Sequence, residues 1–74
     1  MANAAIHTVP AGTEWENKRA GSDDVLSRHR TQSQAVEAGR EQARTDRAEH
    51  VIHGEDGAIR ERNSYGNDPT ASKG

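Results

Sequence analysis

The first thirty residues carry the pattern of short strands separated by turns. Residues 6–9 are an apolar-rich stretch, ended by a Pro and a Gly. Residues 13–19 (TEWENKR) alternate, so that an extended chain places Trp15 and Asn17 on one face and glutamates on the other. A turn-like AGSDD segment follows, and residues 25–30 are a third extended candidate. The pattern predicts three strands in an antiparallel meander.

The middle of the chain has a helical pattern. Residues 31–34 (TQSQ) have the form of a capping box, in which Thr31 accepts from the backbone three residues on. A helix is therefore predicted over about 31–46. At 100° per residue its inner face is made mostly of small residues, which suits close packing on a sheet. That face contains Ala35, Val36, Ala38, Gly39, Gln42 and Ala43.

The segment 49–62 predicts a β-hairpin. Two extended stretches, 49–53 and 58–62, flank a Gly-Glu-Asp-Gly turn, and Asp-Gly favours a two-residue type I′ loop. With that loop, or with a four-residue one, Ile52 and Ile59 share the inner face. A three-residue loop would separate them. Val51, His53, Arg60 and Arg62 are then expected on the outer face.

Together these elements predict an α+β fold, with a single helix packed on a small antiparallel β-sheet in the order β-β-β-α-β-β. One domain is expected over 6–66, with a flexible N-terminus at 1–5 and a disordered C-terminal tail at 67–74. The predicted core is Ile6, Trp15, Leu26, Ala35, Val36, Gly39, Ala43, Ile52 and Ile59.

Composition narrows the function classes. The chain of 74 residues has only eight Leu, Ile and Val residues and no Phe, so its core is thin and help from a partner or a second copy is expected. It has no Cys, which excludes disulfides, thiolate zinc sites and cysteine nucleophiles. No signal peptide or apolar run of about 20 residues is present, and a cytoplasmic protein is expected.

One set of motifs resembles a known family. Val9-Pro10, Trp15, Thr31-Gln32 and the segments VIHG, DG, IR and SYGNDP between 51 and 69 carry the likeness. They resemble the small bacterial family called domain of unknown function 2188, over about residues 6–74. Asn17 departs from the family pattern, which usually has an apolar residue there. The resemblance implies a compact sheet-plus-helix domain and no established activity.

The candidate chemistry is sparse. The spacing His50-x-x-His53 would place the two rings on opposite faces of a strand, and only a set of histidines from distant elements stays open as a metal site. Asp56 is explained by its turn and Asp68 by its place before Pro69. No nucleotide-binding, nucleophile-elbow or zinc-protease motif is present. We therefore expect no catalytic residue, no metal, no cofactor and no enzyme activity.

Two functions stay open. The first is a non-enzymatic binding or accessory protein that acts through protein–protein contacts, including self-association. The alternative is a nucleic-acid-binding module with a basic stripe on the open sheet face, although the net charge of −2 and interleaved glutamates weaken the field. No membrane contact is expected. The candidate binding surface is Arg28, Arg30, His53, Arg60, Arg62 and Tyr65.

Overall fold

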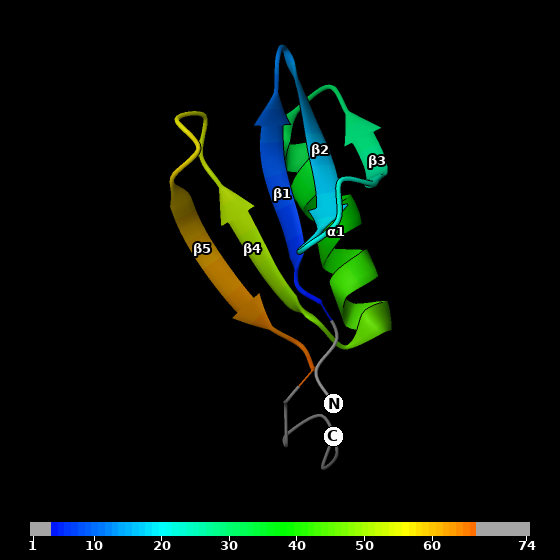
Figure 1. Ribbon diagram of the computed structural model, residues 1–74. Coiled ribbons are helices and arrows are strands. Elements are labelled where there is room, and N and C mark those ends of the chain that lie inside the picture. Colours follow the sequence, from blue (N-terminus) through cyan, green and yellow to red (C-terminus); the bar gives the residue numbers. More distant parts are fainter. Residues whose placement is uncertain (1–3, 67–74) are drawn as a thin grey trace.

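The computed structural model describes residues 4–66, which form five strands and one helix (Figure 1). Along the chain these are β1 (Ile6–Ala11), β2 (Glu14–Arg19), β3 (Val25–His29), α1 (Gln32–Asp46), β4 (Glu49–His53) and β5 (Ile59–Ser64). The α+β class and the β-β-β-α-β-β order are confirmed. The expected tail at 67–74 and most of the expected flexible N-terminus lie outside the described residues.

The sheet is mixed rather than wholly antiparallel. Its strand order is β3-β2-β1-β4-β5, in which β1 and β4 run parallel and every other neighbouring pair is antiparallel. The meander ends at β3 on one edge, and α1 carries the chain back across the sheet to the free side of β1. A connection of this kind returns the chain in the same direction, so β4 pairs parallel with β1.

Local capping sets both ends of α1. Thr31 Oγ1 accepts a hydrogen bond from the Gln34 amide at 3.1 Å, as the capping box predicts. At the other end Arg47 takes a left-handed conformation (φ 54°, ψ 51°), and the Ala48 amide donates to the Ala43 carbonyl at 2.8 Å. Gly66 packs on this turn so closely that a Cβ there would lie 2.0 Å from the Arg47 carbonyl oxygen. The segment that follows β5 is therefore fitted to the end of the helix.

The core under α1 is small and partly polar. Ile6, Ala43 and Ala48 form its apolar centre, with Tyr65 packed against them. The predicted small face of the helix is confirmed at Ala35, Gly39 and Ala43, which are buried. Three buried polar residues on the strands face this helix surface. We call them the polar cluster: Thr8, Asn17 and His50.

Two predicted core residues are wrong. Leu26 is 36% exposed and Ile59 is 48% exposed, and both lie on edge strands. Val36 is only half-buried. Val51 lies on the expected outer face between His7 and Arg62 but is buried. Trp15 and Ile52 are buried as predicted.

The hairpin register explains the exposure of Ile59. The Gly54 amide donates to the Ala58 carbonyl at 2.8 Å, and Gly57 has a φ of 88°, so the loop has three residues instead of the predicted two. A loop of this length, with a left-handed Gly at its end, pairs His53 with Ile59. The register then shifts, and Ile52 pairs with Glu61 as predicted. Ile59 consequently turns away from the helix with His53.

Candidate functional site

The helix does not extend over β5, the last strand of the sheet. It contacts β1, β2, β3 and β4 but not β5, and β5 stands clear of it in Figure 1. Between α1 and the hairpin lies a groove of about 560 Å³, which we call the α1–β5 groove. Its lining residues are Gln32, Ser33, Val36, Glu37, Arg40, Ile52, Arg60 and Glu61.

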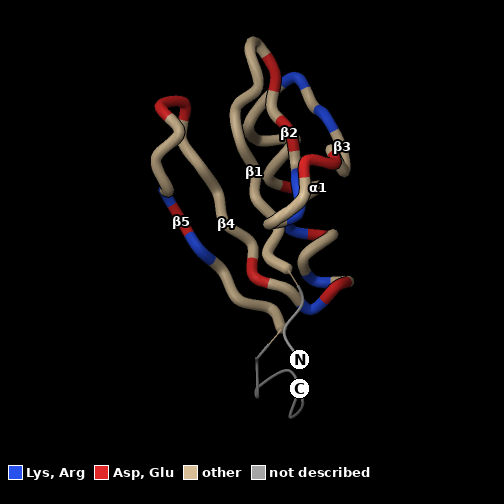
Figure 2. Tube along the Cα trace, viewed as in Figure 1, with Lys and Arg blue, Asp and Glu red and all other residues tan. Residues whose placement is uncertain are grey.

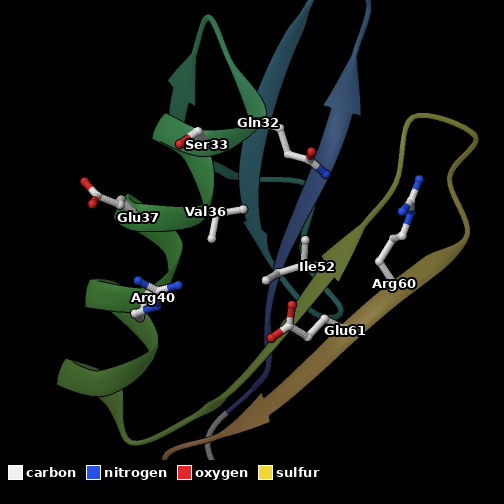
Figure 3. Close-up of a pocket in the computed structure, with 8 residues that line it drawn as sticks. All are labelled: Gln32, Ser33, Val36, Glu37, Arg40, Ile52, Arg60 and Glu61. Carbon is white, nitrogen blue, oxygen red and sulfur yellow. The ribbon is translucent and has the colours of Figure 1, made fainter.

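The groove has a narrow apolar floor and a charged rim. Val36 and Ile52 point toward each other between α1 and β4 (Figure 3). The helix supplies Arg40 to one wall, and β5 supplies Glu61 to the other. Arg60 lies along the hairpin, and its Nε would be only 2.7 Å from a Cβ at Gly54. Such a surface can take a short apolar side chain and select its neighbours by charge.

The outer side of β5 is an open sheet edge. Among the described strands β5 pairs only with β4, so its other side has no strand neighbour. Edge strands present unpaired backbone N–H and C=O groups that can pair with another chain. Ile59 adds an exposed apolar side chain at the start of this edge. The groove and the free edge therefore share β5, with the groove on the helix side of this strand.

The structure does not bring the predicted basic residues together. Arg28 and Arg30 belong to the β3 edge, whereas Arg60 and Arg62 are on β5, with three strands between the two pairs. Arg28 contacts Glu16, and its Nε lies 3.8 Å from Glu14. Figure 2 shows basic and acidic segments interleaved along the trace. The described residues thus have no continuous basic stripe across the sheet.

The other two predicted site residues have different surroundings. The Tyr65 side chain packs on the core, and its amide donates to the Ala48 carbonyl at 3.3 Å. Tyr65 thus holds the segment after β5 to the turn that follows α1. His53 is half-buried on the helix-free face and hydrogen-bonds His7, with 2.9 Å between His53 Nε2 and His7 Nδ1. Of the six predicted residues, only Arg60 lines the groove.

Sequence reasoning missed the polar cluster. Thr8 Oγ1 donates to Asn17 Oδ1 at 2.5 Å, so it accepts from His50 Nε2 at 2.8 Å. Asn17 Nδ2 donates to the Ala35 carbonyl at 2.9 Å, which ties β2 to the helix. A Cβ at Gly39 would lie 2.5 Å from Asn17 Oδ1. One signal in the sequence could have found it. His50 and Ile52 are two residues apart in a strand, so both side chains point to the same side, and Ile52 was predicted to face the core.

The buried position of His50 favours its neutral form. This side chain is fully buried, and burial lowers its pKa, as does the nearby Arg40 charge, while Glu61 opposes the shift. Its Nδ1 has no hydrogen-bond partner among the described residues. With Nε2 occupied by Thr8 and the ring closed off from solvent, His50 is placed as a structural group rather than a catalytic base.

The described residues contain no group of three or more His, Cys, Asp or Glu side chains that could hold a metal ion. Within residues 4–66, α1 is also too short and polar to cross a membrane. The described residues that line the groove include carboxylates, guanidinium groups and the Ser33 hydroxyl, and no histidine.

Comparison with known proteins supports the resemblance seen in the sequence. The model of one family, described as an uncharacterised protein conserved in bacteria (DUF2188), matches residues 6–65. No curated protein and no solved structure matches the chain. The matched residues run from the start of β1 to Tyr65 and so include every strand and the helix. Because the match spans most of its length, the chain belongs to the family of domain of unknown function 2188.

Proposed function

We propose that this chain is a non-enzymatic, cytoplasmic binding or accessory protein that acts through protein–protein contacts at β5 and the α1–β5 groove. The observation that carries the proposal is the position of α1, which contacts four strands and leaves β5 beside a groove of about 560 Å³. A thin core with an uncovered edge is the arrangement that a bound segment would complete.

The contact would use strand addition. An extended segment that pairs with the free side of β5 gains main-chain hydrogen bonds, and its alternate side chains supply specificity. The groove lies on the helix side of the same strand, where Val36 and Ile52 accept an apolar group and Arg40 and Glu61 select charge. Affinity and selectivity would then come from adjacent parts of one surface.

A different chain fits this edge better than a second copy. Two identical strands that pair antiparallel about a two-fold axis place the residue on the axis opposite its own copy. The registers that overlap most of β5 put Glu61 opposite Glu61, or Arg62 opposite Arg62. Like charges directly opposite each other destabilise a strand pair. A partner segment with the reverse charge order avoids this conflict.

Nucleic-acid binding has less support. The two arginine pairs lie at opposite edges, and Arg28 and Arg62 each have a carboxylate within 4 Å. Trp15, the candidate stacking residue, is only 8% exposed. Titration of labelled single- and double-stranded oligonucleotides at low salt should give no more binding than a charge-matched control protein. Specific, salt-dependent binding would favour this alternative instead.

A charge-swap comparison tests the proposed surface. The double variant Arg60→Glu/Glu61→Lys keeps the net charge and reverses the groove rim, whereas Glu41→Lys/Arg44→Glu makes the same exchange on the exposed helix face. Each tagged chain is used to capture proteins from native lysate. A partner captured by the parent and the helix variant but lost from the rim variant supports the proposal. Equal capture by all three, or a strictly monomeric chain that captures nothing, contradicts it.

A further inference from the structure

Two histidines from distant parts of the chain meet on the helix-free face of the sheet. His7 is on β1 and His53 is at the end of β4, and these strands are parallel neighbours. His7 Nδ1 lies 2.9 Å from His53 Nε2, and the ring centroids are 5.1 Å apart. Both rings are half-buried, so one side of the pair stays open to solvent. The spacing within β4 alone could not reveal this pair.

A backbone contact fixes which nitrogens carry protons. His53 Nδ1 lies 2.9 Å from the Gly57 carbonyl oxygen, which can only accept, so this nitrogen carries the hydrogen. The neutral His53 ring therefore presents a lone pair at Nε2, and His7 Nδ1 donates to it. A single proton between two ring nitrogens holds the pair together. If His7 carries its hydrogen on Nε2 instead, His7 Nδ1 and His53 Nε2 both direct lone pairs into the space between the two rings.

We propose that His7 Nδ1 and His53 Nε2 together bind a divalent transition-metal ion, with Zn²⁺ as the test ion, in place of that shared proton. Zinc–imidazole bonds of about 2.0–2.1 Å in tetrahedral geometry separate two ligand nitrogens by about 3.3 Å. The observed 2.9 Å needs only a small opening of the two rings. The Gly57 carbonyl already supplies the second hydrogen bond that orients a metal-binding histidine.

The surroundings define the kind of site. Glu49 and Arg62 are the charged groups whose fields act on His7, and they lie 3.7 Å apart (Arg62 Nη1 to Glu49 Oε1). Burial, followed by the neighbouring His53, lowers the pKa of His7, which favours the neutral ring that a metal requires. No third protein ligand joins the pair among the described residues. Water would complete the coordination, and imidazole ligands suit Zn²⁺, Cu²⁺ and Ni²⁺.

The bound ion would connect β1 to the hairpin. His53 and Gly57 belong to the β4–β5 turn region, whereas His7 belongs to the central strand. An ion shared by both would hold the hairpin against the sheet and stabilise the folded chain in proportion to its occupancy. The site is on the opposite face from the α1–β5 groove, so it is independent of the proposed protein contact.

The test titrates ZnCl₂ into the metal-free full chain at pH 7.5. Calorimetry should give one ion per chain, and long-range ¹H–¹⁵N spectra should show the shift at His7 Nδ1 and His53 Nε2. Since loss of a hydrogen-bond partner behind a ligand already costs about 10-fold or more in metal affinity, His7→Ala and His53→Ala should each weaken binding by more than that. The matched control His29→Ala should bind as the parent does.

Three results would overturn the proposal: no zinc binding by the parent, undiminished binding in both variants, or zinc-dependent shifts at His29 or His50 without any at His7 and His53. Circular dichroism establishes whether each variant is folded. If a variant is unfolded, the ring-nitrogen shifts of the parent chain decide alone, because they identify the coordinating atoms directly.

Discussion

The part of the sheet under α1 and the β5 strand beside it use the same residue types in opposite ways. Ile6, under the helix, is fully buried with Ala43 and Ala48, whereas Ile59 on β5 is 48% exposed. The Asn17 side chain is fully buried and hydrogen-bonded, whereas the Asn63 side chain on β5 donates to Glu61 at the surface. The side chains of the covered part hold the fold together, whereas β5 has mostly exposed side chains and one backbone edge without a strand neighbour among the described residues.

The largest expected difference in stability is between alanine variants of the buried Ile6 and the exposed Ile59. Ile6→Ala should lower the free energy of unfolding by about 2–5 kcal/mol, because it leaves a cavity in the only apolar cluster of the described residues. Ile59→Ala should cost under about 1 kcal/mol, because the side chain is half in solvent. Urea unfolding of both variants measures the contrast. Equal losses would show that the hairpin contributes as much to the core as β1 does.

The next largest effect is expected at Gly39, where the helix backbone lies close to the polar cluster. Gly39→Ala introduces a Cβ 2.5–2.8 Å from Asn17 Oδ1, His50 Nε2 and Thr8 Oγ1. We expect it to cost about 1–3 kcal/mol through overpacking, despite a gain in helix propensity of about 1 kcal/mol. Glu41→Ala on the exposed helix face is the control and should be near neutral. A more stable Gly39→Ala variant would contradict the packing of the polar cluster.

Acid should lower the free energy of unfolding through His50, the buried histidine under α1. Burial lowers the pKa of His50 in the folded chain, so the unfolded chain binds the proton more readily. Stability is therefore complete above the ordinary histidine pKa of about 6.5 and is lost as the pH falls below it, by up to about 1.4 kcal/mol per pH unit for each such histidine. His7 contributes in the same direction.

Unfolding free energies at pH 8, 6.5 and 5 measure this loss. Asp46 does not interfere at these pH values. Hydrogen bonds from Gln42 and Arg19 lower its pKa, so its protonation would reduce stability only in stronger acid. His50→Gln should reduce the slope below pH 6.5 even if it also lowers stability at pH 8. An unchanged slope would place the acid sensitivity elsewhere.

The smallest effect is expected on β5 itself. Arg62 Nη1 lies 3.7 Å from Glu49 Oε1, and both side chains are well exposed. Exposed ion pairs of this kind contribute about 0.2–1 kcal/mol, so Arg62→Gln should shift the unfolding midpoint only slightly. A loss larger than that of Gly39→Ala would mean that β5 supports the fold more than its exposure indicates.

Local signals account for what the sequence could predict. The capping box at Thr31 and the small residues facing the sheet depend only on neighbours within the helix, and both are confirmed. The inward side of β2 follows from simple alternation: Trp15 and Asn17 are buried, and Arg19 Nη1 reaches Asp46 Oδ2 at 2.9 Å. Family motifs such as Tyr65-Gly66 are explained by a tight fit to the end of α1.

Features that depend on distant pairing escape prediction. The parallel contact of β1 with β4 joins segments about 40 residues apart, and it also creates the His7–His53 pair. The predicted burial of Ile59 is wrong because Gly57 allows a three-residue loop where Asp56-Gly57 alone favours two. The groove depends on where α1 crosses the sheet, and no local pattern encodes that position. The predicted basic residues lie on or beside strands, but at opposite edges of the sheet.

Native-state amide hydrogen exchange of the full chain tests the central contrast most directly. Amides of β1 and β2, which are paired on both sides, should exchange only with global unfolding, and half of the β5 amides, those on its free side, should exchange rapidly at all protein concentrations. Uniform protection along β5, equal to that of β1, would contradict the account, because it would mean that the edge is already covered.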